Sequence, residues 1–175
     1  MKQICFPKIT LMQVMLLILC VCIAFSAQAG KMIIEKGKKA PDFTLPDLKG
    51  EEYTLSRHSG EYKATLIIIW GVWCPYCRAI MVALKKDYSR LKAAGMEIVT
   101  ISIRESPKKV ALFINKLAPD FIVLTDEWGD LKDSYQIKDV PRIVILDRDQ
   151  NVDAMAITTS AKMVETMIAK ALKRQ

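Results

Sequence analysis

A run of four aliphatic residues, Leu66-Ile67-Ile68-Ile69, lies in the middle of the chain, inside the apolar segment from Ala64 to Trp70. A strand that is apolar on both faces must be covered from both sides, as in the sheets of α/β proteins. Helical spacing of apolar residues follows from Pro75 to Ala94. Pro75 suits the first helical position, where a missing N–H breaks no intrahelical hydrogen bond. The sequence therefore predicts a buried strand that turns directly into a helix.

Strand and helix patterns continue on both sides of this unit. Apolar runs and alternation predict strands, whereas apolar residues three and four apart predict helices. Before this unit we expect a hairpin of Phe43–Leu45 and Tyr53–Leu55 with a turn at Asp47–Gly50. After it we expect strands at Ile98–Ile103 and Phe121–Leu124, a helix from Ser106-Pro107, and a short helix with Trp128, Leu131 and Tyr135. The chain should end with a hairpin of Ile143–Leu146 and Val152–Ile157 and a closing helix through Val164, Ile168 and Leu172, capped near Thr159 or Ser160. This order predicts an α/β fold whose mostly parallel sheet is covered on both faces.

The first thirty residues differ in character from the rest. Two lysines precede a 15-residue apolar stretch from Leu11 to Phe25, which leads into Ser26-Ala27-Gln28-Ala29. A basic head, a short apolar middle and an Ala-x-Ala exit are the parts of a secretory signal. We expect residues 1–29 to be cleaved and residues 30–175 to form one domain in the periplasm or otherwise outside the cytoplasm. An uncleaved anchor is the alternative, although a spanning helix needs roughly 20 residues.

Cleavage would change the cysteine count. Cys5, Cys20 and Cys22 would leave with the signal, so Cys74 and Cys77 would be the two thiols of the mature domain. A domain of this size can form a sufficient core without a disulfide, and a bridge across two residues restricts the unfolded chain very little. Stabilisation of the fold is therefore a poor explanation of the pair.

The position of the pair favours thiol chemistry. Cys74 and Cys77 stand where the central strand is expected to end and the helix to begin, the usual place for a site in an open α/β sheet. Unpaired N–H groups and the helix dipole favour a thiolate at Cys74, and a thiolate is the species that attacks a disulfide. Cys77 follows almost one turn later and more deeply in the fold. We expect Cys74 to attack a partner and Cys77 to resolve the mixed disulfide.

Other chemistries have weaker support in the sequence. Zinc needs three or four ligands, whereas the mature chain offers the two cysteines and His58, so we expect no metal and no other cofactor. The formal net charge of +7 includes the two signal lysines, which leaves about +5 without a long basic run. We therefore expect no nucleic-acid partner. A redox-inactive structural pair is a further alternative.

Three segments carry a resemblance to a known family: Gly37-Lys-Lys-Ala-Pro-Asp-Phe-Thr-Leu45, Trp70-Gly-Val-Trp-Cys-Pro-Tyr-Cys77 and Asp139-Val140-Pro141. In this order they resemble the TlpA/ResA branch of the thioredoxin superfamily over residues 37–157. The resemblance implies a three-layer thioredoxin-like fold with a central mixed sheet flanked by helices and an added N-terminal β-hairpin. It also implies an extracytoplasmic thiol–disulfide oxidoreductase that favours reduction.

The resemblance further implies which residues meet a client protein. Pro141 is expected to be a cis-proline that faces the cysteines, and Val140 to offer its backbone to an extended segment. With these two, the expected substrate-binding residues are Trp73, Pro75 and Tyr76. The expected partners are cysteine-containing client proteins and an upstream thiol donor such as a membrane thiol reductase. A membrane is expected only if the N-terminal segment is retained.

Two departures from the family pattern concern proton transfer. Thioredoxins bury an Asp six residues before the first cysteine, where this chain has Ile68. Many ResA-like members carry a Glu three residues after the second cysteine, where this chain has Ile80. The resolving thiol therefore lacks its familiar proton carrier, and water is a candidate for that role. Arg78 and Arg142 would favour the Cys74 thiolate if they lie near it.

Two other functions share part of the pattern. The opening Ala40-Pro41-Asp42-Phe43 also resembles peroxiredoxins, so a peroxidase is an alternative. That family needs a Pro and a Thr or Ser ahead of its peroxidatic cysteine, and Gly71 and Ile68 occupy those places before Cys74.

Glutaredoxins share Cys-Pro-Tyr-Cys with this chain, but the Gly-Gly pair with which they hold glutathione is absent here. A thioredoxin-fold module that binds extended peptides without turnover is the second alternative.

Overall fold

The computed structural model describes residues 32–58 and 60–174. The chain divides into two units, residues 1–32 and 33–175, and the account below concerns the second unit. The predicted signal sequence lies outside the described residues. Within the described part of the chain, no helix is long and apolar enough to cross a lipid bilayer.

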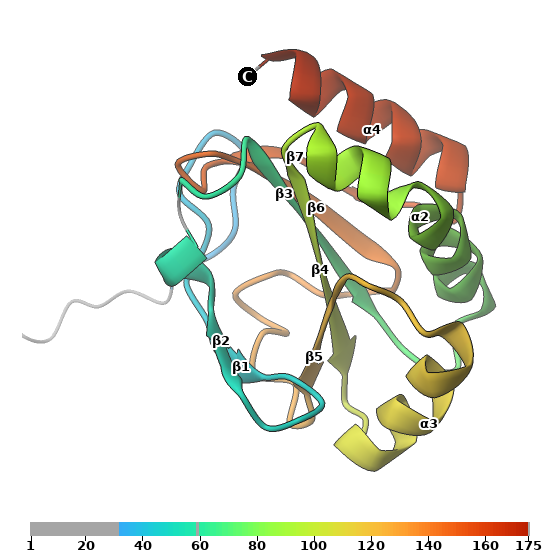
Figure 1. The fold of residues 1–175 in the computed structure, drawn as a ribbon. Coiled ribbons are helices and arrows are strands. Elements are labelled where there is room, and N and C mark those ends of the chain that lie inside the picture. Colours follow the sequence, from blue (N-terminus) through green and yellow to red (C-terminus); the bar gives the residue numbers. More distant parts are fainter. Residues whose placement is uncertain (1–31, 59, 175) are drawn as a thin grey trace, which may run out of the picture. The chain divides into compact units, whose positions relative to one another are not determined.

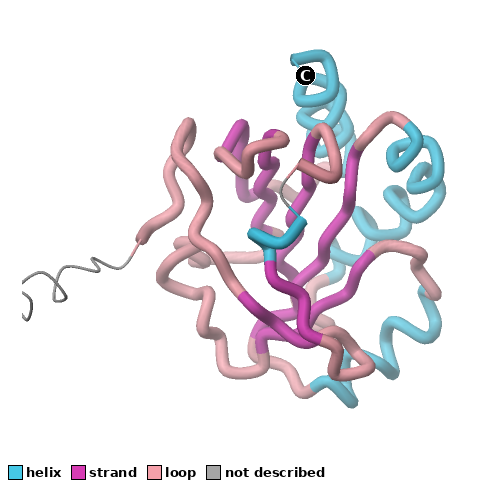
Figure 2. The backbone as a smooth tube through the Cα atoms, turned by 60° about the vertical axis from the view of Figure 1, so that its left-hand side comes forward, coloured by secondary structure: helices cyan, strands magenta, loops and turns pink. Residues whose placement is uncertain are grey.

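A five-stranded mixed sheet forms the centre of the domain, with the strand order β5-β4-β3-β6-β7 (Figures 1 and 2). The strands are β3 (Ala64–Trp70), β4 (Met96–Ile103), β5 (Ile122–Asp126), β6 (Arg142–Asp147) and β7 (Val152–Ile157). Strands β3, β4 and β5 run parallel, whereas β6 is antiparallel to both β3 and β7. The sheet is therefore mixed, as the resemblance implies, rather than mostly parallel as the order of strand and helix patterns predicts, and β3 is its middle strand.

Both faces of β3 are buried, as its apolar run predicts. Leu66 and Ile68 belong to the cluster of buried side chains on one face, and Ile67 and Ile69 belong to the cluster on the other. All four side chains have no solvent exposure. Because successive residues of a strand point to opposite faces, this run can supply both cores at once.

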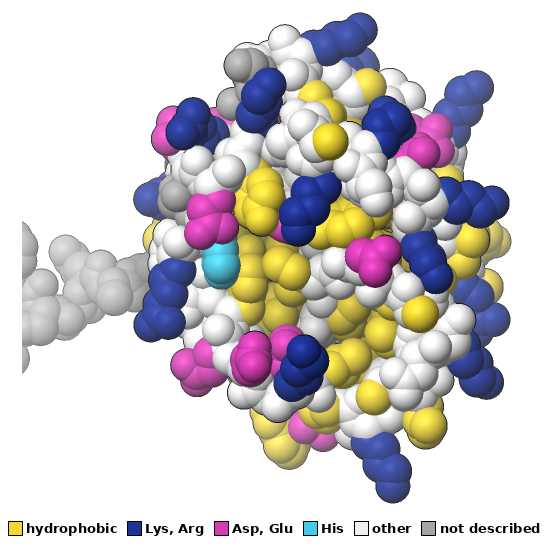
Figure 3. All heavy atoms as spheres, viewed as in Figure 1, with side chains coloured by type: hydrophobic (Ala, Val, Ile, Leu, Met, Phe, Trp, Pro, Cys, Tyr) yellow, Lys and Arg dark blue, Asp and Glu magenta, His cyan; other side chains and the backbone are white. Residues whose placement is uncertain are grey.

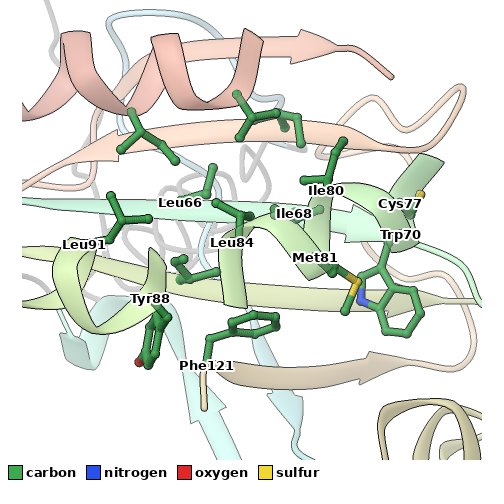
Figure 4. Close-up of a cluster of buried hydrophobic side chains, with 14 of the residues drawn as sticks. Leu66, Ile68, Trp70, Cys77, Ile80, Met81, Leu84, Tyr88, Leu91 and Phe121 are labelled. Atoms are coloured by element: carbon green, nitrogen blue, oxygen red, sulfur yellow. The ribbon is translucent and has the colours of Figure 1, made fainter. Parts of the chain in front are cut away.

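Three helices cover one face of the sheet (Figure 2). They are α2 (Pro75–Ala93), α3 (Pro107–Leu117) and α4 (Ala161–Arg174). The crossovers β3–α2–β4 and β4–α3–β5 advance in the same direction across the sheet, so right-handed connections place α2 and α3 on the same side. Figure 4 shows Ile80, Leu84 and Leu91 of α2 packed over Leu66 and Ile68 of β3.

The helix ends follow the predicted signals. Gly95, directly after the C-cap of α2, has φ +96°, a left-handed conformation that glycine adopts without steric cost. The Ser160 hydroxyl oxygen accepts a hydrogen bond from the Met163 N–H at 3.3 Å, so Ser160 caps α4. Both boundaries agree with the sequence analysis.

The N-terminal hairpin and two loop segments cover the opposite face. Strands β1 (Thr44–Pro46) and β2 (Glu52–Thr54) are antiparallel, and the short 3₁₀ helix η1 (Leu55–His58) follows them. The buried side chains Phe43 and Tyr53 pack here with Tyr135, whose hydroxyl donates to the Pro41 carbonyl at 2.7 Å. The expected fold class, including the added hairpin, is confirmed.

The predicted short helix through Trp128, Leu131 and Tyr135 is wrong, because this segment forms a series of turns. The Asp126 carboxylate accepts hydrogen bonds from the N–H groups of Gly129, Asp130 and Leu131 at 2.8–3.1 Å. Gly129 has φ +78°. This capped turn still buries Leu131 and Tyr135, so their spacing reflected burial rather than a helix.

Candidate functional site

Cys74 and Cys77 form a disulfide at the junction of β3 and α2, with an S–S distance of 2.14 Å and a Cα–Cα distance of 5.3 Å. Cys74 is the N-cap of α2, with extended backbone angles, and Pro75 occupies the first turn. The Cys77 N–H donates to the Cys74 sulfur at 3.1 Å. The predicted strand–helix geometry is therefore present, and the Cys74 sulfur lies where the helix N–H groups favour negative charge.

The two sulfurs differ in depth. Cys77 has no exposed surface and packs in the core cluster that contains Ile68 and Ile80. Cys74 keeps 4% exposure and is the outer residue of the pair. An attacking thiolate must reach its partner, so Cys74 is the sulfur that solvent or another protein meets first.

The Val140–Pro141 peptide bond is cis, as predicted. It leads into β6, and the Val140 carbonyl oxygen lies 3.9 Å from the Cys74 sulfur. In the disulfide this sulfur carries no proton, so the contact is one of van der Waals type. A reduced Cys74 thiol would find an acceptor at this oxygen.

The five expected substrate-binding residues have different exposure. Trp73 and Tyr76 are 65% and 56% exposed, and Pro75 is also exposed. Val140 is half-buried and Pro141 is buried. The residues next to Cys74 in sequence thus expose apolar and aromatic side chains, and the Val140 carbonyl oxygen lies beside its sulfur.

The Trp73 indole lies over the backbone at Gly71. A Cβ atom at Gly71 would come within 2.7 Å of the indole Nε1. A side chain at this position would force the indole to move, so glycine permits the observed position of Trp73.

A cleft of about 260 Å³ lies between Trp73, which precedes Cys74, and Val140. Its lining includes the apolar residues Trp73, Ile137 and Val140, and the cations Arg104 and Lys132. The combination of apolar walls with a few charged groups is common in binding sites.

A buried carboxylate that the sequence analysis missed holds the segment before Cys74. Glu105 Oε2 accepts hydrogen bonds from the Val72 N–H at 2.7 Å and from the Ser102 hydroxyl at 3.0 Å. Its Oε1 lies 2.8 Å from the Lys109 ammonium. Glu105 is 5% exposed. Glu105 comes just after the carboxyl end of β4, and this end lies beside the carboxyl end of β3, where the cysteines follow. A polar residue directly after a predicted neighbouring strand was therefore the sequence signal that could have identified Glu105.

The places of the family's two acids are apolar in the structure as well. Ile68 and Ile80 are fully buried in the cluster that holds Cys77. Among the described residues, no group of three or more His, Cys, Asp or Glu side chains converges as a metal site.

The two arginines considered for the thiolate point elsewhere. The Arg78 guanidinium stacks on the Phe113 ring of α3, 5.1 Å from its centroid. Arg142 pairs in the sheet with Ile69, whose side chain faces away from α2, and its Nη2 lies 3.3 Å from the Met155 sulfur. Burial lowers the pKa of Arg142. By strand alternation Arg142 is on the sheet face opposite the cysteines.

Comparison with known proteins agrees with this geometry. A model of the AhpC/TSA family matches residues 36–155. The thiol–disulfide oxidoreductase ResA of Bacillus subtilis is 30% identical over 140 residues, which cover 80% of this chain and 75% of the relative. ResA of Geobacillus kaustophilus is 29% identical over 132 residues, which cover 75% of each chain.

A solved structure has a similar fold. It is assigned as the thiol:disulfide interchange protein DsbE of Chlorobium tepidum, with a TM-score of 0.72 and 26% identity. The match covers 79% of this chain and 99% of that one. The chain therefore belongs to the AhpC/TSA family of thioredoxin-fold proteins, and within it to the ResA-like thiol–disulfide oxidoreductases.

Proposed function

We propose that the protein reduces disulfides in client proteins outside the cytoplasm through Cys74 and Cys77. The observation that carries the proposal is the position of the pair: a disulfide at the start of α2 whose outer sulfur accepts the Cys77 N–H at 3.1 Å. The N-terminal signal pattern supports the location. The resemblance supports reduction as the direction.

The reaction begins from the reduced pair. The Cys74 thiolate attacks one sulfur of a client disulfide, forms a mixed disulfide and expels the other client sulfur as a thiolate. The Cys77 thiolate then attacks the Cys74 sulfur and releases the second client thiolate. Two electrons pass to the client, and the Cys74–Cys77 disulfide remains. An upstream thiol donor restores the dithiol by the same exchange in reverse.

The α2 N-terminus supports the first step. The Cys77 N–H and the helix dipole stabilise negative charge on Cys74, which raises the thiolate fraction at neutral pH. The places of the two acids that related proteins carry near this pair are taken by Ile68 and Ile80. The proton of Cys77 is then passed to the departing client thiolate or to water that enters with the client.

The surface around Cys74 suits an extended client segment. Exposed Trp73, Pro75 and Tyr76 offer apolar contacts, and the Val140 carbonyl offers a backbone acceptor. The cleft beside Val140 can take a side chain of that segment. A segment bound in this way would bring its cysteine to Cys74 rather than to the buried Cys77.

Insulin reduction by the purified protein with dithiothreitol tests the proposal. We expect catalysed precipitation of the insulin B chain, and no catalysis by Cys74→Ser. Peptide binding that survives replacement of both cysteines, without turnover by the wild type, would support the binding module. Consumption of hydrogen peroxide without disulfide reduction would support the peroxidase.

A further inference from the structure

A second cleft, of about 480 Å³, lies between α2 and α3. One wall is the active-site segment itself, since Val72 precedes Cys74 by two residues and Arg78 directly follows Cys77. Its volume lies within the range of about 300–1,000 Å³ of ligand sites. The lining of this cleft therefore begins within two residues of the cysteines in sequence.

The floor and rim of this α2–α3 cleft are largely apolar. The lining includes Val72, Val82, Leu112, Phe113 and Leu117. Leu112 is 63% exposed and Val82 is 39% exposed, although both stand beside a hollow. Exposed apolar side chains in a concave region gain free energy when another apolar group covers them.

The charges of the α2–α3 cleft have one sign. Among the residues that the structure describes, Arg78, Lys109 and Lys116 line it and no carboxylate does. Lys109 is paired with Glu105, whereas in residues 32–58 and 60–174 neither Arg78 nor Lys116 forms an ion pair. Figure 3 shows lysine and arginine side chains along the right-hand edge, the side on which Figure 1 draws α3. The cleft thus attracts negative charge.

We propose that the α2–α3 cleft binds an apolar segment of the client that carries Asp or Glu side chains, next to the cysteine held at Cys74. The inference rests on the proposed function and narrows its substrate class. Apolar side chains of the segment cover Leu112 and Val82, while its carboxylates pair with Arg78 and Lys116. A basic segment would meet like charges, which disfavours it.

Two disulfide peptides of equal length test this inference. One has a flank of alternating Leu and Glu, and the other has Lys in place of each Glu. The measured quantity is the ratio of their kcat/KM values for reduction by the reduced protein. We expect the wild type to prefer the acidic peptide. Lys116→Glu should lower that preference about three- to tenfold, because one favourable rim contact becomes repulsive.

A matched variant controls for overall charge. Lys170→Glu changes the net charge by the same amount on the exposed side of α4 and should leave the preference unchanged. Leu112→Ser should lower kcat/KM for both peptides, because both cover this side chain. Equal effects of Lys116→Glu and Lys170→Glu on the preference would overturn the inference.

The remaining outcomes separate the possible failures. If the wild type reduces neither peptide, the proposed function fails; if it reduces both without preference, only the cleft assignment fails. A fatty acid could present the same chemistry, so decanoate is titrated by tryptophan fluorescence. Decanoate binding that Lys116→Glu weakens, with unchanged peptide preference, would identify a lipid site and overturn the inference.

Discussion

Removal of the Glu105 carboxylate is the most informative test of how the fold holds the segment before Cys74. In Glu105→Ala, the N–H of half-buried Val72 and the hydroxyl of buried Ser102 lose their acceptor. Each unsatisfied donor costs about 1–3 kcal/mol. The ion pair with Lys109 adds little, because that side chain is 56% exposed. Part of these losses is offset, because Glu105→Ala also removes the free-energy cost of burying a carboxylate.

The net loss expected for Glu105→Ala is about 2–4 kcal/mol, a large share of the roughly 5–15 kcal/mol that stabilises a typical domain. Glu105→Gln keeps one carbonyl oxygen, which can accept both hydrogen bonds, so it should lose clearly less than Glu105→Ala, chiefly because the two bonds no longer go to a charged acceptor. Urea unfolding of the oxidised protein, followed by circular dichroism, measures both. Glu165→Ala is the matched control: this exposed glutamate of α4 should change stability by less than about 0.5 kcal/mol. A Glu105→Ala loss as small as that of the control would refute the reasoning.

Three further predictions follow from single features. Gly71→Ala should displace the Trp73 indole, alter its fluorescence and lower kcat/KM for peptide disulfides with little change in stability; unchanged fluorescence would contradict this. Burial raises the pKa of Tyr135, and Asp42 and Tyr53 add to this shift. The free energy of unfolding should therefore fall as the pH rises above about 10, where tyrosine ionises in the unfolded chain but not in the folded one. In urea titrations, Tyr135→Phe should make that fall less steep. The mature protein should begin at Gly30, and an intact mass of the envelope form that retains residues 1–29 would disprove the cleavage.

The central strand and the helix that follows it were predictable because local signals and tertiary packing agree there. The run Leu66–Ile69 has the composition of a strand buried on both faces, and Pro75 marks the start of α2. Gly95 marks the end of that helix. The position of the cysteines at a helix start follows from these signals alone, which is why the geometry of the pair could be predicted.

Side-chain partners distant in sequence were harder to predict. The spacing of Leu131 and Tyr135 suited a helix, but the segment forms a series of turns whose first N–H groups donate to the Asp126 carboxylate. Glu105 lies 33 residues from Val72 in sequence, and no local pattern indicates their hydrogen bond. Arg142 follows Pro141 directly and was therefore a candidate to lie near the sulfurs, but strand alternation places its side chain on the other face of the sheet.

Trapping of clients by single-cysteine variants tests the central claim most directly. Envelope extracts are quenched with acid after exposure to Cys77→Ser or Cys74→Ser, and mixed disulfides are resolved on non-reducing gels. Cys77→Ser should accumulate them, because Cys74 still attacks and nothing resolves the product. Cys74→Ser should trap none, because Cys77 is fully buried. Equal trapping by the two variants, or trapping mainly by Cys74→Ser, would contradict the assigned roles.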